Sequence, residues 1–410
     1  MNIVISKKHN STNENTVIAL YLYSASIVDV LRSVLFIAGI QSDYNDLIRN
    51  VVYIGVFILY FKYMVSNYKK ITIITGLFIL LLVFSIIINR DIAGFSTTLI
   101  LLFFSRFIVA IIMFSSIHDF DLFSDQCHSW SWIAILYYFV YTVFSRVYIT
   151  NYSYNMAFSY NMLLPAVLSL YYLIIRQKRR IYSIAIFFFS FIGILQFGSR
   201  GAIACIIASL LFMITYLFID KKNGIIFISL IAIFALIVSL FSNEILNFLV
   251  QTFPNSRNLS MLRSNSFYEL SNRDNYWKIA LDSFTSSPFS FRGIAGDCEC
   301  ICDYLRINYS LSYYSHNFFI ESLVSYGVLI GGGCIIAFGN RVIKVIYNCF
   351  KYKNANSLVF VFLIPYITFM MISGSIWQSY QHWIVFGILI NRSVLGYKKM
   401  NAGNKEVVLS

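Results

Sequence analysis

The stretch of sequence that decides the fold is ITIITGLFILLLVFSIIIN, from Ile71 to Asn89. Its nineteen residues include no charged side chain. A helix rises about 1.5 Å per residue, so this stretch would span about 28 Å, close to the roughly 30 Å hydrocarbon core of a bilayer. It is therefore predicted to be a transmembrane helix.

Apolar runs of similar length recur along the chain. The 410 residues are 59% hydrophobic and only 12% charged, with a mean hydropathy of +0.71. A water-soluble domain could not cover so much apolar surface. These features predict an all-α integral membrane protein with about twelve transmembrane helices. The predicted spans are 17–40, 51–66, 71–89, 92–116, 129–149, 156–175, 181–198, 201–219, 224–242, 317–339, 358–375 and 379–396.

Lysine and arginine predict the orientation of these spans, because they accumulate in cytoplasmic loops. With a cytoplasmic N-terminus, alternate loops hold Lys7, Lys8, Lys69, Lys70, Arg176 to Arg180, Lys221, Lys222, Arg341 to Lys353, Lys398 and Lys399. Both termini are thus predicted to be cytoplasmic. The predicted regions are transmembrane helices 1–9 (1–242), a large periplasmic loop (243–315), and helices 10–12 with a cytoplasmic tail (316–410). This topology explains most of the net charge of +13, which is therefore not read as nucleic-acid affinity.

The kind of cation changes across the membrane. The predicted outer side holds one lysine, Lys278, against nine arginines: Arg49, Arg90, Arg146, Arg200, Arg257, Arg263, Arg273, Arg292 and Arg306. Arginine binds phosphate in a bidentate manner and tolerates low dielectric better than lysine. An anionic, phosphate-bearing substrate is the favoured interpretation. The alternative is that these arginines pair with the acids Asp274, Asp282 and Asp297.

Two of these arginines are predicted to lie at helix starts, where free N–H groups favour an anion. Arg200 follows the turn Phe197-Gly198-Ser199, and the alternative for it is a boundary residue that reaches to the interface. Arg273 lies in Ser271-Asn272-Arg273-Asp274, which has the form of a capping box. The spacing of Trp277, Ala280, Leu281 and Phe284 then predicts an amphipathic helix over 272–285 within the loop.

The long loop ends at Tyr314-Ser315-His316-Asn317, where the tenth span opens. Histidine titrates near neutral pH and can take a proton from a hydroxyl group. Asn317 or Glu321, one turn into the span, is expected to fix its tautomer. The alternative is a solvated structural histidine at the membrane boundary.

Two other features of the sequence leave their role open. Cys298, Cys300 and Cys302 lie two residues apart in the outer loop, where a disulfide is permitted but not required, and no cysteine spacing predicts a metal site. Asp29 lies three residues before Arg32 inside the first span, and this pair is expected to be structural.

Together these motifs resemble the O-antigen polymerase and ligase superfamily over roughly residues 150–340. The resemblance rests on the order of four elements and on the stretch Asn155 to Tyr160 with Pro165, which is similar to the polymerase branch. The four elements are Gly198 to Gly201, Arg273 to Trp277, Pro288 to Gly296, and His316 to Gly327.

The resemblance implies a GT-C-like membrane glycosyltransferase that acts on undecaprenyl-pyrophosphate-linked oligosaccharides at the periplasmic face of the inner membrane, with no cofactor and no metal. It implies His316 as general base, with Arg200 and Arg273 stabilising the pyrophosphate. Arg292 or Arg306 is expected to support them in substrate binding, together with Asn317 and Glu321. Whether a polysaccharide chain-length regulator binds is left open.

Polymerase is the favoured branch. The ligase pattern is His-Asn, nine further residues, and then Gly-x-x followed by Gly, Thr or Tyr. Gly327 fits this pattern, but the last position is Ile330. A third alternative, a lipid-linked oligosaccharide flippase or other transporter, would account for twelve spans. Transporters commonly consist of two similar halves, and no such repeat is present in this sequence.

Overall fold

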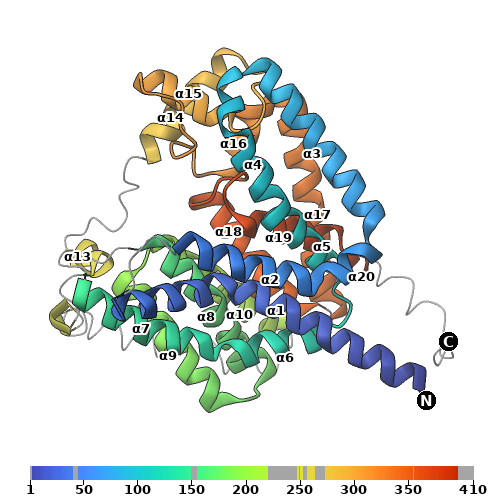
Figure 1. Cartoon of the computed structure of the whole chain (residues 1–410), viewed down its shortest axis with the longest axis vertical. Coiled ribbons are helices and arrows are strands. Elements are labelled where there is room, and N and C mark those ends of the chain that lie inside the picture. Colours follow the sequence, from blue (N-terminus) through green and yellow to red (C-terminus); the bar gives the residue numbers. More distant parts are fainter. Residues whose placement is uncertain are drawn as a thin grey trace. The chain divides into compact units, whose positions relative to one another are not determined.

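The computed structural model describes residues 2–39, 45–148, 155–219, 247–248, 250–252, 256–263, 273–353 and 355–395. These residues form helices and connecting loops, with no strand among them (Figure 1). The chain divides into two compact units. Unit 1 comprises 1–62, 121–269 and 360–365, and unit 2 comprises 63–120, 270–359 and 366–410.

Unit 1 contains a bundle in which α8 is central, packing on α9 and α10, while α1 packs on α7. Asn155 starts α8, because its side chain accepts a hydrogen bond from the N–H of Phe158 (3.0 Å). The helices of this unit are α1 (Asn2–Ile37), α2 (Asn45–Ser66), α6 (Phe120–Trp130), α7 (Trp132–Tyr148), α8 (Met156–Tyr171), α9 (Arg180–Phe197), α10 (Arg200–Ile219) and α13 (Arg257–Arg263).

Unit 2 contains an apolar helix pair, α5 on α19, and a second group in which α14, α15 and α16 contact one another (Figure 1). Ala280, Cys300 and Val324 form the small core of that second group. The helices of unit 2 are α3 (Tyr68–Ile88), α4 (Ser96–Leu102), α5 (Ile108–Ser116), α14 (Arg273–Ser286), α15 (Gly296–Leu305), α16 (Phe318–Tyr326), α17 (Gly333–Tyr352), α18 (Ile364–Ile372), α19 (Tyr380–Ile390) and α20 (Arg392–Leu395).

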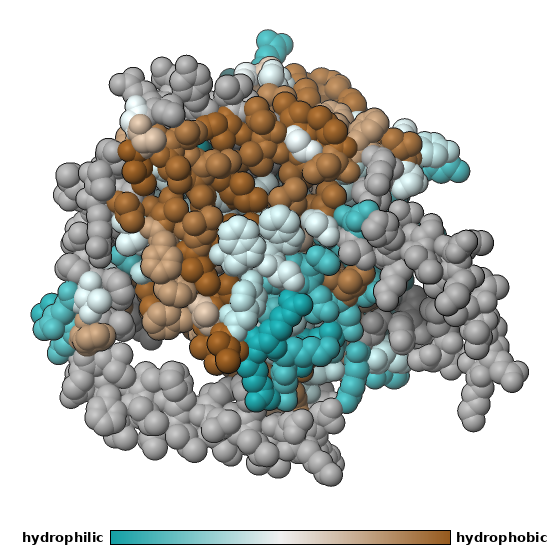
Figure 2. Space-filling model, turned by 60° about the horizontal axis from the view of Figure 1, so that its bottom comes forward, coloured by the Kyte–Doolittle hydropathy of each residue, from teal (hydrophilic) through white to brown (hydrophobic). Residues whose placement is uncertain are grey.

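Seven helical stretches among the described residues are long and apolar enough to cross a membrane. They are Asn13–Ile37, Tyr68–Ile88, Arg90–Ser116, Met156–Arg176, Arg180–Phe197, Arg200–Phe218 and Phe318–Tyr352. Many of their large apolar side chains are exposed, such as Leu77 and Ile87 of α3. Figure 2 shows a broad hydrophobic area on one face. Such a surface requires lipid rather than water, so the chain is a multi-pass membrane protein.

These seven stretches coincide with seven of the predicted spans. The spans predicted at 358–375 and 379–396 correspond to the shorter apolar helices Leu358–Ile372 and Tyr380–Ile390. Those predicted at 51–66 and 129–149 fall on α2 and α7, and the one at 224–242 lies outside the described residues. The total of twelve crossings stays a prediction.

The amphipathic helix predicted over 272–285 is confirmed as α14. Its Ala280 is buried, Trp277 and Phe284 are half-buried, and Leu281 is exposed. Ser271 and Asn272 of the predicted capping box lie outside the described residues.

Candidate functional site

Three successive carbonyl groups at the end of α18, those of residues 371–373, accept hydrogen bonds from side chains of the predicted loop and of the start of the tenth predicted span. Asn317 Nδ2 donates to the first (3.0 Å), Arg273 Nη1 to the second, and His316 Nδ1 to the third (3.3 Å). The hydroxyl of Tyr314 also donates to the third (3.3 Å). The last carbonyls of a helix lack partners within the helix and form the negative end of its dipole. The end of α18 therefore gathers Arg273, His316 and Asn317 at one place in unit 2.

Arg273 is the first residue of α14 and is half-buried. A guanidinium group has five N–H donors in a fixed fork. The described residues hydrogen-bond one of them, through the carbonyl of Ile372. The remaining donors, beside the free N–H groups of the first turn of α14, are suited to an anion such as a phosphate.

His316 is held as a neutral base. A carbonyl oxygen only accepts, so the contact with Ser373 assigns the proton to Nδ1 and leaves the lone pair on Nε2. Burial, together with the positive charge of Arg273, lowers the pKa of His316 from 6.5 to about 4, although the hydrogen bond to the Ser373 carbonyl partly opposes both effects. The ring lies against that of Tyr314, with centroids 3.9 Å apart.

The residue before His316 is fixed from both sides. Asp297 Oδ2 accepts from the N–H of Ser315 (2.8 Å), and the indole N–H of Trp277 donates to the carbonyl of Ser315. His316 itself has a φ of 54°, in the left-handed region that non-glycine residues rarely adopt. The two contacts on Ser315 hold the chain in this conformation and so direct the imidazole ring.

Asp297 is a positioning residue that the sequence did not reveal, because it was interpreted only as a partner for outer arginines. It is fully buried in the first turn of α15. Burial raises the pKa of its carboxyl group, although the N–H and hydroxyl of Ser315 oppose this. Its Oδ1 atom is buried without a hydrogen bond from any described residue. Trp277 was quoted in a motif, but nothing in the sequence indicated its contact with Ser315.

Asn317 and Glu321 do not bind the imidazole ring directly, which corrects the expectation that one of them fixes the tautomer of His316. Asn317 Oδ1 caps α16, accepting from the N–H groups of residues 319 and 320 (2.9 and 3.2 Å). The fully buried carboxylate of Glu321 accepts from Ser375 Oγ and the N–H of Ile376 (both 2.9 Å). The physical reason is that the free N–H groups of the helix start, the hydroxyl of Ser375 and the N–H of Ile376 need acceptors.

Arg292 and Arg306 lie elsewhere in unit 2. Arg292 Nη2 donates to Ser283 Oγ (3.0 Å), and Ser283 is ten residues beyond Arg273, or about 15 Å along α14. Arg306 is exposed in a left-handed conformation just after α15. The described contacts thus place neither beside His316.

Arg200 is in unit 1, as the first residue of α10, and is half-buried. The preceding Gly198 has no room for a Cβ atom, which would overlap the carbonyl of Ile194 and the hydroxyl of Ser159. Asn258 Nδ2 donates to the carbonyls of Ile194 (3.2 Å) and Gly198 (2.9 Å). The end of α9 before Arg200 is therefore capped by a polar side chain from α13, much as the end of α18 is capped in unit 2.

The three cysteines between residues 298 and 302 carry free thiols. Cys298, Cys300 and Cys302 are all buried on α15, and none is in a disulfide. Burial raises the pKa of each thiol, which disfavours the reactive thiolate. Within the described ranges, no group of three or more His, Cys, Asp or Glu residues is placed to hold a metal ion.

Residues 185–335 match the sequence profile of a family described as O-antigen ligase. This region runs from α9 into α17 and contains all seven predicted site residues: Arg200, Arg273, Arg292, Arg306, His316, Asn317 and Glu321. No curated protein matches the chain with significant similarity. Residues 185–335 are therefore similar to the O-antigen polymerase and ligase superfamily.

Proposed function

We propose that this protein is an O-antigen polymerase, which joins undecaprenyl-pyrophosphate-linked oligosaccharide repeats into polysaccharide at the periplasmic face of the bacterial inner membrane. The observation that carries the proposal is the pair formed by a cation and a neutral base on one helix end, Arg273 and His316. A glycosyl transfer from a lipid pyrophosphate needs both groups, one for the leaving group and one for the acceptor.

In the proposed reaction, His316 Nε2 takes the proton of a hydroxyl group on the acceptor sugar. The acceptor oxygen forms a bond to the anomeric carbon of the donor glycan, and the bond from that carbon to the pyrophosphate oxygen breaks. The lipid pyrophosphate leaves with the bonding electron pair. Arg273 stabilises the charge that grows on it, and such stabilisation is often the largest single contribution to catalysis.

The other predicted residues have supporting roles in this proposal. Arg200, at the start of α10 in unit 1, has the same helix-start chemistry as Arg273, and its proposed role is to bind a phosphate group. Arg292 and Arg306 bind the substrate further along the loop. Asn317 and Glu321 act by holding residues 371–376, which in turn hold His316.

The proposed membrane arrangement is that of the sequence analysis: twelve spans in a GT-C-like fold, cytoplasmic termini and a periplasmic loop over 243–315. An apolar groove between helices would hold the polyprenyl tail. A chain-length regulator is a possible further partner.

Ligase activity, transfer of finished glycan to lipid A–core, is the second candidate, and one observation favours it. Gly327–Gly332 is a π-helical segment, whose turn takes about one residue more than an α turn. Gly331 thus comes one turn after Gly327, and a Cβ atom there would overlap the carbonyl of Ser322. Glycine at 331 can therefore take the place one turn after Gly327 that the ligase pattern gives to position 330.

The lipopolysaccharide ladder of a strain deleted for the gene tests the proposal. A polymerase predicts core bearing a single repeat unit, restored to a full ladder by the native gene. Bare core with long polymer on the lipid carrier would identify a ligase instead. An unchanged ladder would contradict both and favour a transporter.

A further inference from the structure

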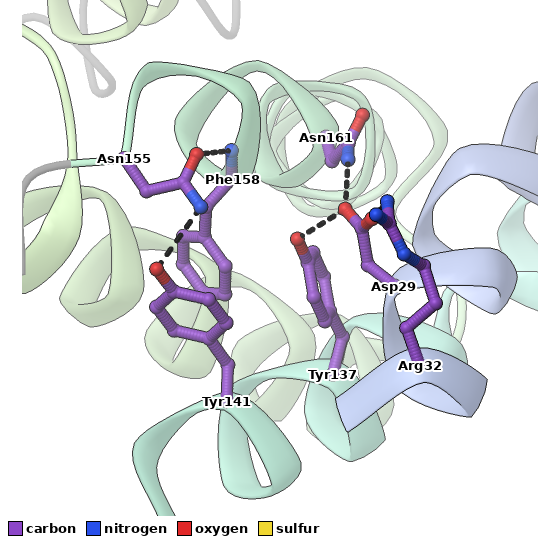
Figure 3. A network of polar contacts seen from close by, with 7 residues as sticks. All are labelled: Asp29, Arg32, Tyr137, Tyr141, Asn155, Phe158 and Asn161. Atoms are coloured by element: carbon purple, nitrogen blue, oxygen red, sulfur yellow. Dashed lines mark hydrogen bonds and ion pairs between the residues drawn. The ribbon is translucent and has the colours of Figure 1, made fainter. Parts of the chain in front are cut away.

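Unit 1 contains a cavity of about 390 Å³ that the proposed reaction does not use. It lies where α1, α7 and α8 meet, and its lining includes Asp29, Arg32, Phe36, Tyr137, Tyr141 and Asn155. Figure 3 shows five of these side chains converging, in the order Asn155, Tyr141, Tyr137, Asp29 and Arg32. The volume is at the lower end of the range for small-molecule sites, so the cavity suits one small ligand group.

The polar groups of this cavity are held rigidly by the surrounding helices. Asp29 Oδ2 accepts from the hydroxyl of Tyr137 (2.7 Å) and from Asn161 Nδ2 (3.2 Å). Asn155 Nδ2 donates to the hydroxyl of Tyr141 (3.0 Å) (Figure 3). Three helices are thus connected through side chains that also face the cavity, which is the preorganisation that a binding site requires.

Hydrogen-bonding capacity remains after these contacts are counted. The nearest approach of Arg32 to Asp29 is 3.9 Å, from Nη1 to Oδ1, which is too long for a hydrogen bond. Oδ1 of Asp29 and the N–H groups of Arg32 are therefore not hydrogen-bonded by any described residue. Asn155 Nδ2 has a second hydrogen, while its Oδ1 serves as the cap of α8. The cavity can both accept from and donate to a polyhydroxyl ligand.

The balance of charge selects the class of ligand. The carboxylate of Asp29 would repel a phosphate, and the guanidinium of Arg32 would repel a cation, so together they favour neither ion. A purely apolar chain would leave Oδ1 of Asp29 and the N–H groups of Arg32 without hydrogen bonds, which is unfavourable. A neutral sugar ring carries no charge that either ionic group would repel. Its hydroxyls can bind the charged groups and the amide, and its apolar C–H face can pack on Tyr137, Tyr141 or Phe36.

We propose that this cavity binds one neutral sugar residue of the lipid-linked oligosaccharide, an inference that rests on the proposed function. The expected topology agrees, because Arg32 falls in the outer half of the span predicted at 17–40 and Asn155 comes just before the outer end of the span predicted at 156–175. A purely structural ion pair would account for Asp29 and Arg32 alone. It would not account for an open cavity that also has an aromatic wall and an amide.

The test is saturation-transfer NMR on the full-length protein in nanodiscs. The probes are the repeat-unit oligosaccharide released from its carrier lipid by mild acid, and a panel of neutral monosaccharides. Native protein and His316→Ala should both give signals from ring protons. Asp29→Leu and Tyr141→Ala should each weaken the apparent Kd about tenfold or more, as expected for losing a charged hydrogen bond or a packing face.

Matched controls make the result decisive. Tyr304→Ala removes an exposed tyrosine (71% exposed) from α15 in unit 2 and should bind as the native protein does. Asp29→Asn keeps the shape and one acceptor, so it guards against a misfolded Asp29→Leu, and it should also weaken binding. Equal binding by native protein and all folded cavity variants would overturn the proposal. Competition by inorganic pyrophosphate would also overturn it, since it would identify an anion site.

The lipopolysaccharide ladder distinguishes failure of the cavity proposal from failure of the proposed polymerase function. If deletion of the gene leaves the ladder unchanged, the polymerase proposal fails, while sugar binding is still measured directly with the monosaccharide panel. If His316→Ala abolishes the ladder and no probe binds, only the cavity proposal fails. Both proposals are supported if the native protein binds the sugar probes and the Tyr141→Ala variant shows weaker binding and a shortened ladder.

Discussion

Arg273 and His316 donate hydrogen bonds to adjacent carbonyl groups, those of Ile372 and Ser373. Burial is the main cause of the low pKa of His316, and the group proposed to bind the leaving pyrophosphate lowers it as well, because the charge of Arg273 disfavours the imidazolium form. A bound pyrophosphate would neutralise Arg273 and raise the pKa of His316 again. The base would then be strongest when the donor is in place, which couples substrate binding to proton transfer.

Replacing His316 by alanine should remove the general base and lower the rate of polymerisation by about 10² to 10⁴-fold. The measurement is incorporation of labelled repeat units by purified protein, with the lipopolysaccharide ladder as the readout in cells. His118→Ala is the matched control, because His118 contacts Ser393 in another part of unit 2. An unchanged rate in His316→Ala would exclude this residue as the base.

The pH dependence should reveal the effect of Arg273. His316 must be unprotonated to act, so kcat/KM should stay high at neutral pH and fall as the pH falls through about 4. In Arg273→Gln the positive charge is gone, the pKa of His316 rises, and the acid limb should move to higher pH. Rates measured between pH 4 and pH 8 for both proteins test this. A limb that does not move would show that Arg273 has no electrostatic effect on the base.

Arg273→Lys should also be strongly impaired, although it retains the charge. Lysine cannot donate to the carbonyl of Ile372 and bind a phosphate in a bidentate manner at the same time. The rate should fall roughly 10²-fold, comparable to the loss of one donor to a developing anion. Lys278→Gln is the control, because it removes an exposed cation from the same helix. Equal rates for Arg273→Lys and native protein would show that charge alone suffices.

The local spacing of apolar residues predicted the helices well, but it did not predict the long-range contacts of the candidate site. The spacing of Trp277, Ala280 and Phe284 predicted α14 to within one residue at each end, because an amphipathic face depends only on neighbours along the chain. The docking of Arg273 and His316 on residues 372 and 373 joins positions 99 and 57 residues apart, and no local pattern encodes it.

The arginines of the predicted loop also show that the sequence does not reveal long-range contacts. The sequence gives no reason to distinguish Arg273, Arg292 and Arg306, but their surroundings in the structure differ. Arg273 donates to a carbonyl at the end of a helix, and Arg292 donates to the hydroxyl of Ser283. Arg306 is exposed. For Asp297, charge alone indicated an arginine partner. Its burial and its hydrogen bond from the N–H of Ser315 depend on how α15 packs against α14 and α16.

Asp297 should tolerate asparagine but not leucine. Asparagine can still accept from the N–H of Ser315, and it removes a buried carboxyl group whose pKa is raised, so stability at neutral pH should be equal or higher. Leucine leaves that N–H unsatisfied, at about 1–3 kcal/mol, and frees the chain next to His316. Thermal unfolding and kcat should separate the variants. If Asp297→Leu keeps native kcat, Asp297 does not position the base.

Gly327→Ala should destabilise the protein, whereas Gly333→Ala should not. Gly327 has a φ of 68°, and an added Cβ atom would lie 2.7 Å from the carbonyl oxygen of Ser290. The next residue donates from its N–H to the carbonyl of Pro288 (2.8 Å), so a shift here would displace the segment between α14 and α15. The combined strain is of the order of 1–3 kcal/mol. Gly333 has open space around its Cβ position at the start of α17, where alanine should gain about 0.5–1 kcal/mol. The unfolding temperatures of the two variants in detergent should therefore move in opposite directions, and a shared direction would contradict the packing described for residues 288–290.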